Sequence, residues 1–260
     1  MHLRQIRIST GRRTALAAAG AGLFLAAVRT APAHAAEAAN GAPARLVLVY
    51  SLMRNGMEIA RVEETSERSG GGYRITSEAR AVGVAALLAR GQGWQRESRG
   101  NVSAAGLRPE QFTDQRGANP AQRARFDWAA GQIRFDRPGT DAAEGDTEAL
   151  LPETTDRLSF PYALAYRAAQ PPGLPSGEWD APMTDGRRVS RYRFTVAGRE
   201  TISTPAGAFE AIRVSRLREK DDNATDVWLA AARGIVPVRI LVTEPNGTTF
   251  DQVLVQIGGQ

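Results

Sequence analysis

The sequence contains no cysteine, and both of its histidines, His2 and His34, lie within the first 35 residues. If that segment is a removable leader, the rest of the chain has neither a thiol nor an imidazole. Disulfides, Ser–His and Cys–His nucleophilic pairs, and zinc, haem or iron–sulfur sites held by these side chains are then excluded. We expect no cofactor, no metal and no catalytic residues, although a hydrolase that uses only two carboxylates is still open.

An excess of positive charge is also lacking beyond the first residues. The formal net charge is +5 over 260 residues, but residues 1–35 carry five arginines and no acidic residue. Removing those five from the total of 33 leaves 28 basic residues, which balance the 28 acidic ones. The charge therefore gives no reason to expect a nucleic-acid partner.

The first 35 residues have the layout of a secretory signal peptide. Four arginines precede an apolar run over residues 14–28, and Ala33-His34-Ala35 is a small-x-small cleavage site. That run is shorter than the roughly 20 residues that a spanning helix needs. We expect cleavage near Ala35, a flexible N-terminus over 36–44 and localisation to the periplasm, with general and twin-arginine export both open.

The remaining sequence has the pattern of strands joined by tight turns. Residues 46–53 are apolar on both alternating faces, and the Asn55-Gly56 pair that follows predicts a hairpin. Turn signals at Ala129-Ala130-Gly131 and Pro245-Asn246-Gly247 predict two more hairpins. We expect a single domain over 45–258, mainly β, with about ten to twelve antiparallel strands and one or two helices.

Three segments depart from this pattern. Residues 156–170 predict a helix, with Thr155 or Asp156 as its N-cap. Residues 82–89 are apolar without alternation, which is typical of a short buried helix or a mobile lid. Residues 140–153 are acidic and predict a solvated loop.

One strand of the C-terminal third carries several arginines. Tyr192 and Phe194 share a face with Arg188, whereas Arg191 and Arg193 occupy the opposite face. The arginines of that second face could grip a phosphate or an acidic headgroup. The favoured interpretation is a solvent-facing side paired with acids of a neighbouring strand.

Some apolar residues exceed what strand pairing requires. They could be ordinary core, or they could line a cavity for an acyl chain. The candidate lining residues are Val82, Leu87, Leu88, Trp94, Phe160 and Leu164.

A series of short motifs in a fixed order resembles a bacterial exported family, the domain of unknown function 3108, over most of residues 45–258. The motifs are Asn55-Gly56, Tyr73-Arg74-Ile75, residues 83–87, residues 106–112, Phe126-Asp127-Trp128, residues 156–159, residues 192–200, residues 204–209, residues 227–230 and residues 235–240. The resemblance implies a single antiparallel curved sheet forming an open or partial barrel, with one or two short helices against its concave side. In lipoprotein carriers of similar shape the concave side takes apolar ligand, and the family supplies no catalytic residues.

These observations favour a periplasmic, non-enzymatic binding protein that holds a lipid or another hydrophobic molecule in a curved-sheet cavity. The alternative is a structural or interaction protein of the cell envelope, with a packed core and a protein partner.

Overall fold

The computed structural model describes residues 44–89, 93–136, 146–232 and 234–258. The chain divides into two units, Met1–Ala33 and His34–Gln260, and every described residue belongs to the second. The predicted leader and most of the predicted flexible N-terminus therefore lie outside the described residues.

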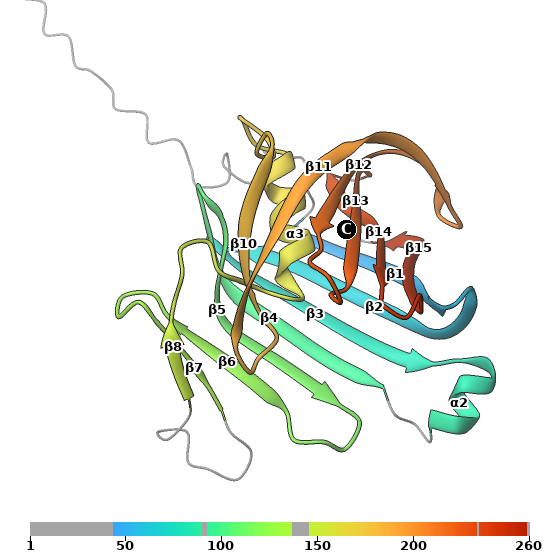
Figure 1. The fold of residues 1–260 in the computed structure, drawn as a ribbon, viewed down its shortest axis with the longest axis horizontal. Helices are drawn as coiled ribbons and strands as arrows, with labels where there is room; N and C mark the ends of the chain where they lie inside the picture. Colours follow the sequence, from blue (N-terminus) through green and yellow to red (C-terminus); the bar gives the residue numbers. More distant parts are fainter. Residues whose placement is uncertain (1–43, 90–92, 137–145, 233, 259–260) are drawn as a thin grey trace, which may run out of the picture. The chain divides into compact units, whose positions relative to one another are not determined.

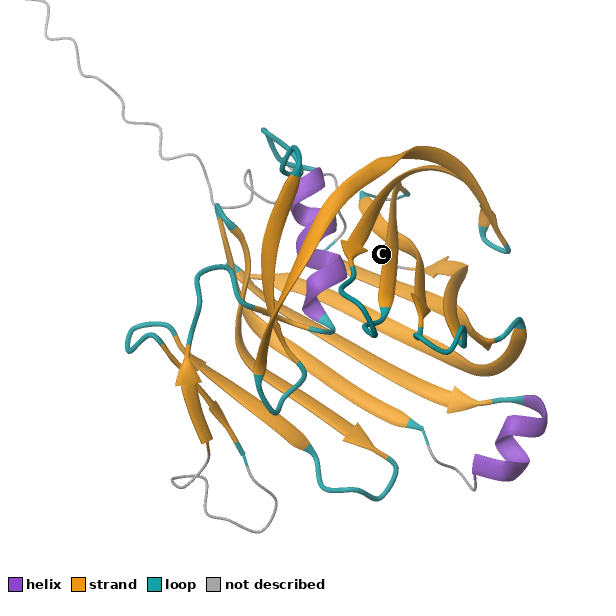
Figure 2. Ribbon diagram, viewed as in Figure 1, coloured by secondary structure: helices purple, strands orange, loops and turns teal. Residues whose placement is uncertain are grey.

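The described part consists of one large sheet and two helices (Figure 1, Figure 2). Its strands are β1 (Arg45–Arg54), β2 (Met57–Ser69), β3 (Gly72–Ala81), β4 (Trp94–Ser103), β5 (Gly106–Arg116), β6 (Gln122–Asp127), β7 (Gln132–Phe135), β8 (Asp146–Ala149), β9 (Thr155–Asp156), β10 (Glu178–Thr184), β11 (Val189–Thr204), β12 (Gly207–Leu217), β13 (Ala224–Ala231), β14 (Ile235–Thr243) and β15 (Thr249–Gly258). Its helices are α2 (Gly83–Ala89) and α3 (Ser159–Ala168).

The sheet is a meander whose two halves meet at the chain's first and last strands. Its order is β8-β7-β6-β5-β4-β3-β2-β1-β15-β14-β13-β12-β11-β10-β9. All neighbours pair antiparallel except β9 and β10, which are parallel. The edge strands β8 and β9 do not pair with each other, so the curved sheet stays open. The prediction of an antiparallel, incompletely closed barrel is confirmed.

The first hairpin shows why the local sequence folds this way. In β1 the side chains of Leu48 and Tyr50 are fully buried. Asn55 and Gly56 both have positive φ, 50° and 81°, as a two-residue hairpin turn requires. The Asn55 side chain also accepts a hydrogen bond of 2.8 Å from the backbone N–H of Thr249. This turn therefore joins the N-terminal half of the sheet to its last strand.

Helix α3 crosses the concave side of the sheet and contacts β5, β13 and β14 (Figure 1). It begins at Ser159, later than predicted, because Asp156 lies in strand β9. From there, Oδ1 of Asp156 accepts hydrogen bonds from the backbone N–H groups of Leu158 (2.9 Å) and Ser159 (2.8 Å). The N-cap residue is Leu158, which makes no side-chain capping hydrogen bond, so the prediction of Thr155 or Asp156 as N-cap is wrong, although the Asp156 carboxylate accepts from the backbone at the start of the helix.

Helix α2 lies elsewhere, at the start of the β3–β4 connection, where it contacts β2 and β3 (Figure 2). The expectation of a helix against the concave side therefore holds for α3 alone.

The described residues form 15 strands, more than predicted. Residues 146–149 of the expected acidic loop form the edge strand β8, whereas residues 140–145 lie outside the described part. Strand β9 has only two residues, and β10 contains Pro182. Such short, polar or proline-containing strands carry little alternation in their sequence, so a periodicity criterion misses them.

Candidate functional site

Helix α3 lies between two hollows, and the ring of Phe160 borders both. We call them the tryptophan hollow and the arginine cavity. Their volumes are about 340 Å³ and about 350 Å³, at the small end of the range typical of small-molecule sites.

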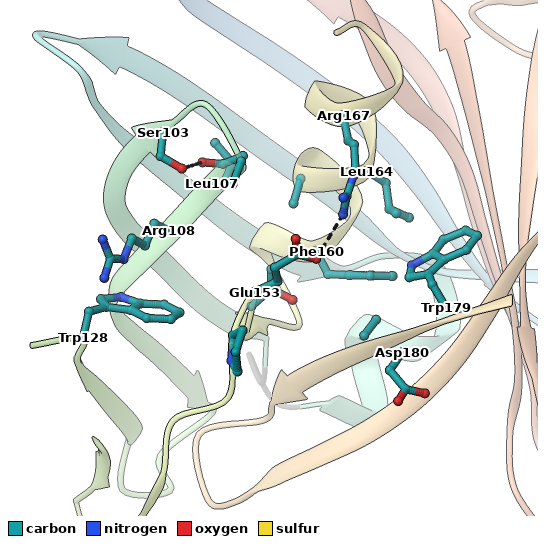
Figure 3. Close-up of a pocket in the computed structure, with 16 residues that line it drawn as sticks. Ser103, Leu107, Arg108, Trp128, Glu153, Phe160, Leu164, Arg167, Trp179 and Asp180 are labelled. Carbon is teal, nitrogen blue, oxygen red and sulfur yellow. Dashed lines mark hydrogen bonds and ion pairs between the residues drawn. The ribbon is translucent and has the colours of Figure 1, made fainter. Parts of the chain in front are cut away.

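The tryptophan hollow lies between α3, the β4–β5 turn and β10 (Figure 3). Its lining residues are Ser103, Ala105, Gly106, Leu107, Arg108, Trp128, Pro152, Glu153, Thr155, Phe160, Ala163, Leu164, Arg167, Trp179, Asp180 and Ala181. Trp128 and Trp179 are drawn on either side of Phe160 in Figure 3. The hollow thus has aromatic and aliphatic walls from several separate segments.

Both tryptophan rings are held in place. The indole N–H of Trp128 donates to the carbonyl oxygen of Pro109 at 2.6 Å, and the Arg108 guanidinium lies 4.6 Å from its ring centroid. The ring of Trp179 stacks on Phe194 at 6.3 Å. A preformed apolar wall of this kind loses little side-chain entropy when a ligand binds.

Six polar residues, four of them charged, also line this hollow. Arg167 forms an ion pair with Glu153 at 3.1 Å. The hydroxyl of Thr155 is buried and has no hydrogen-bond partner in the described structure. Polar groups set in a mainly apolar hollow are typical of sites that orient a largely hydrophobic ligand.

The arginine cavity lies on the other side of Phe160. Four arginines from separate segments reach it: Arg96 of β4, Arg157 before α3, Arg188 before β11 and Arg216 of β12. The remaining lining residues are Glu64, Leu158, Phe160, Pro161, Met183, Thr184, Asp185, Ser190, Tyr192, Phe194, Thr225, Val227, Ile240, Val242 and Gln252. One part of the cavity is therefore cationic and another part is apolar.

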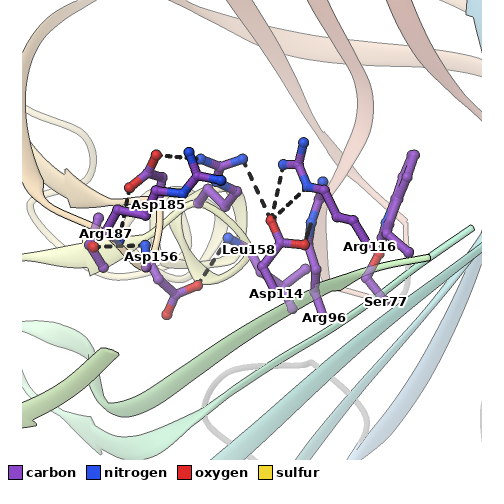
Figure 4. A network of polar contacts seen from close by, with 12 residues as sticks. Ser77, Arg96, Asp114, Arg116, Asp156, Leu158, Asp185 and Arg187 are labelled. Carbon is purple, nitrogen blue, oxygen red and sulfur yellow. Dashed lines mark hydrogen bonds and ion pairs between the residues drawn. The ribbon is translucent and has the colours of Figure 1, made fainter. Parts of the chain in front are cut away.

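A buried carboxylate organises part of this positive charge (Figure 4). Asp114, whose side chain is fully buried, forms ion pairs with Arg96 at 3.2 Å, Arg116 at 3.0 Å and Arg157 at 3.7 Å. Burial alone raises the pKa of Asp114, but the three guanidinium groups outweigh it and hold that pKa below its usual value. Asp185 pairs with Arg157 at 3.2 Å.

Glu64 is a second buried acid, and it lines the cavity itself. Its carboxylate accepts hydrogen bonds from Tyr162 (2.8 Å), Ser77 (3.2 Å) and Gln252 (3.3 Å). Burial raises the pKa of Glu64, and these hydrogen bonds only partly offset that effect. Its oxygens are therefore already engaged with the protein.

The predicted lining residues lie in three different environments. Phe160 and Leu164 are buried, and both line the tryptophan hollow. Trp94 lines a different hollow, beside α2, where Val84 is 67% exposed. Val82 borders none of these hollows, and its backbone N–H donates to the carbonyl oxygen of Ile59 at 3.1 Å. The side chains of Leu87 and Leu88 lie outside the described part of the structure.

The sequence analysis did not single out Trp128, Trp179 or the four arginines of the cavity as a site. One signal was present for Arg188, which was predicted to share a strand face with Tyr192 and Phe194. All three residues line the arginine cavity. On the opposite face Arg193 pairs with Glu178 of the neighbouring strand at 3.3 Å, as expected for a solvent-facing side.

The described residues contain no cluster of three His, Cys, Asp or Glu side chains that could hold a metal ion. In the same part of the chain, neither helix has the length and apolar character needed to cross a membrane. The geometry thus offers two hollows with apolar walls beside α3, one of them rich in guanidinium groups.

The chain is similar to two solved structures. One is a putative lipoprotein from Parabacteroides distasonis, with a TM-score of 0.32, 10% identity, and coverage of 84% of this chain and 98% of the other. The second is a putative exported protein with a YmcC-like fold from Bacteroides fragilis, with a TM-score of 0.32, 11% identity, and coverage of 83% and 96%. No curated protein gives a significant match. The model of a family of proteins of unknown function, DUF3108, matches residues 47–255, and the chain therefore belongs to that family, as its motifs predicted.

Proposed function

We propose that this protein is exported to the periplasm and acts there as a binding protein, without catalysis. Its ligand is a lipid or another hydrophobic molecule, held on the concave side of the sheet beside α3. The signal-peptide pattern of residues 1–35 supports export.

The observation that carries this proposal is the tryptophan hollow. Phe160, Leu164 and Trp179 form apolar walls around a space of about 340 Å³. Side chains of this size usually fill a core completely, because protein interiors pack as densely as organic crystals. An open space between them is a natural site for an apolar chain.

The residue types favour binding over catalysis. Residues 36–260 contain neither cysteine nor histidine, so the usual nucleophile–base pairs cannot form there. The buried acids among the described residues are Glu64, Asp114 and Asp156. Glu64 and Asp156 are each hydrogen-bonded to several protein groups, and Asp114 is paired with three arginines. Those contacts suit a structural role better than proton transfer to a substrate.

Native mass spectrometry of the protein purified from its host without detergent tests the proposal. We expect a co-purified lipid or other apolar molecule. After its removal, an uncharged fluorescent probe such as N-phenyl-1-naphthylamine should bind with increased emission. A ligand-free mass together with no probe binding would overturn the proposal, and a stoichiometric protein partner in its place would favour an envelope interaction protein.

A matched pair of variants locates the site. Ala163 lines the tryptophan hollow, whereas Ala169 follows the same helix and is exposed. Ala163→Phe should fill the hollow and weaken probe binding about tenfold, since the lost apolar contact is worth 1–2 kcal/mol. Ala169→Phe adds the same ring outside the hollow and should leave binding unchanged.

A further inference from the structure

We propose that the arginine cavity recognises the anionic group, a carboxylate or a phosphate, of an amphipathic ligand whose apolar part lies against Phe160 and Phe194. This inference rests on the proposed function and adds the chemistry of the ligand's head.

The first argument is the local charge. Outside the leader the chain is neutral as a whole, yet four arginines converge on one cavity of about 350 Å³. Two acids line the same cavity, Glu64 and Asp185. Two further acids pair with its arginines: Asp114 with Arg96 and Arg157, and Asp222 with Arg216, so that Arg188 alone of the four has no acidic partner among the described residues. Glu64 is engaged by three protein donors, and Asp185 pairs with Arg157. An arrangement of this kind is suited to an anion, since guanidinium groups bind carboxylate and phosphate through paired N–H donors.

The second argument is that several donors of these arginines are unused. The Nε atoms of Arg157 and Arg216 are buried and have no hydrogen-bond partner in the described structure. Arg188, which is exposed, forms no ion pair or hydrogen bond with any described residue. Buried donors without partners are rare in native proteins and call for a specific explanation. An oxyanion in the cavity supplies acceptors for such groups.

The third argument is the position of Arg188. It lies in the β10–β11 turn, next to the strand face that presents Ser190, Tyr192 and Phe194 to the cavity. Arg187 and Arg188 are both exposed, but only Arg188 lines the cavity. Arg188 has no acidic partner among the described residues, so no internal contact holds its guanidinium. Its guanidinium is available for a ligand.

The fourth argument is the apolar wall beside the arginines. Phe160 and Phe194 are buried, with ring centroids 4.7 Å apart, and Val227 is buried beside them in the same core cluster. Phe160 also borders the tryptophan hollow. A ligand with its charged head at the arginines can therefore direct its apolar part toward the aromatic residues of α3.

Isothermal titration calorimetry of the lipid-depleted protein tests this inference with four probes below their aggregation limits. The probes are dodecyl phosphate, dodecanoate, dodecanol and inorganic phosphate. The two chain-bearing anions should bind about tenfold or more tightly than dodecanol, as expected for charge-assisted hydrogen bonds. Inorganic phosphate alone should bind much more weakly than dodecyl phosphate, because it lacks the apolar part.

Two neighbouring arginines provide the matched variants. Arg188→Gln should weaken binding of both chain-bearing anions at least fivefold, as expected for one lost charge-assisted contact. The same variant should leave dodecanol binding unchanged, and Arg187→Gln should change neither. Because Arg188 has no partner in the described structure, the substitution removes no internal contact.

The outcomes separate this inference from the proposed function. If dodecanol binds as tightly as the anions, or Arg188→Gln and Arg187→Gln behave alike, the headgroup inference is overturned while hydrophobic binding stands. If inorganic phosphate binds as tightly as dodecyl phosphate, the cavity is a free-phosphate site and the amphipathic assignment is wrong. If no probe binds at all, both proposals are overturned.

Discussion

The hydroxyl of Tyr162 on α3 donates a hydrogen bond of 2.8 Å to Oε2 of Glu64 on β2. Both side chains are buried, at 4% and 6% exposure. The two residues are far apart in the sequence, and their hydrogen bond holds helix α3 against strand β2 of the curved sheet. It also keeps the carboxylate of Glu64 occupied at the edge of the arginine cavity.

Tyr162→Phe should lower the free energy of unfolding by about 1–3 kcal/mol, because it leaves a buried carboxylate oxygen without this donor. Denaturant unfolding measures the change. Tyr166→Phe is the matched control on the same helix, since Tyr166 is only partly buried and its ring lies 5.6 Å from the Arg68 guanidinium. Equal effects of the two substitutions would show that the Glu64 contact contributes nothing specific.

The buried acids predict an unusual pH dependence. Burial raises the pKa of Glu64 above 4.5 and that of Asp156 above 3.8. Just above those values the folded chain binds more protons than the unfolded chain, so these two groups make stability fall as pH rises. The free energy of unfolding that is lost in this way is recovered when the pH drops toward 4.

Glu64→Gln should therefore flatten the decline in unfolding free energy as pH rises from about 5 toward neutrality. Denaturant midpoints measured at a series of pH values test this. Glu63→Gln, which alters the exposed neighbour of Glu64 on the same strand, should leave the slope unchanged. A steeper decline in Glu64→Gln than in the unsubstituted protein would contradict the assignment.

The sequence predicted those parts of the fold that local periodicity specifies. The Asn55-Gly56 turn and the face shared by Tyr192 and Phe194 are both visible as short-range patterns, because hairpins pair residues close in sequence. The buried positions of Phe160 and Leu164 were visible in the same way. Their place beside a hollow follows from where α3 crosses the sheet.

The arginine cavity could not be predicted in this way. Arg96, Arg157 and Arg216 come from distant segments, and only the curl of the sheet brings them together. Nor does the sequence show that Asp114 would be the fully buried partner of three arginines, since acidic residues are usually exposed. Long-range contacts of single polar residues leave no periodic signal.

Removing the charge of Asp114 should destabilise the protein strongly. Asp114→Asn leaves Arg96, Arg116 and Arg157 without their shared counter-charge, and breaking a buried ion pair costs about 3–5 kcal/mol. Because the pKa of Asp114 is held below 3.8, its contribution is present above that value and is lost as pH falls through the lowered pKa.

Thermal and denaturant unfolding at neutral pH measure the loss caused by Asp114→Asn. Asp185→Asn is the control, because this carboxylate is 35% exposed and pairs only with Arg157 among the described arginines. A partly exposed pair of this type contributes about 0–1 kcal/mol. If both substitutions have the same small effect, Asp114 is not the residue that organises the arginines.

The turn between β10 and β11 depends on Gly186, which packs against the opposite half of the sheet. Its φ is +92°, and a Cβ there would lie 3.2 Å from Cβ of Gln122 and 3.4 Å from Cε1 of Phe112. Gly247 has a similar φ of +86° with open space around it.

Gly247→Ala should therefore cost about 1 kcal/mol through backbone strain alone. Gly186→Ala should cost about 1 kcal/mol more, since it also overpacks a buried contact. Denaturant unfolding of both variants tests the difference. Equal losses would mean that the β10–β11 turn does not pack tightly across the open seam of the sheet.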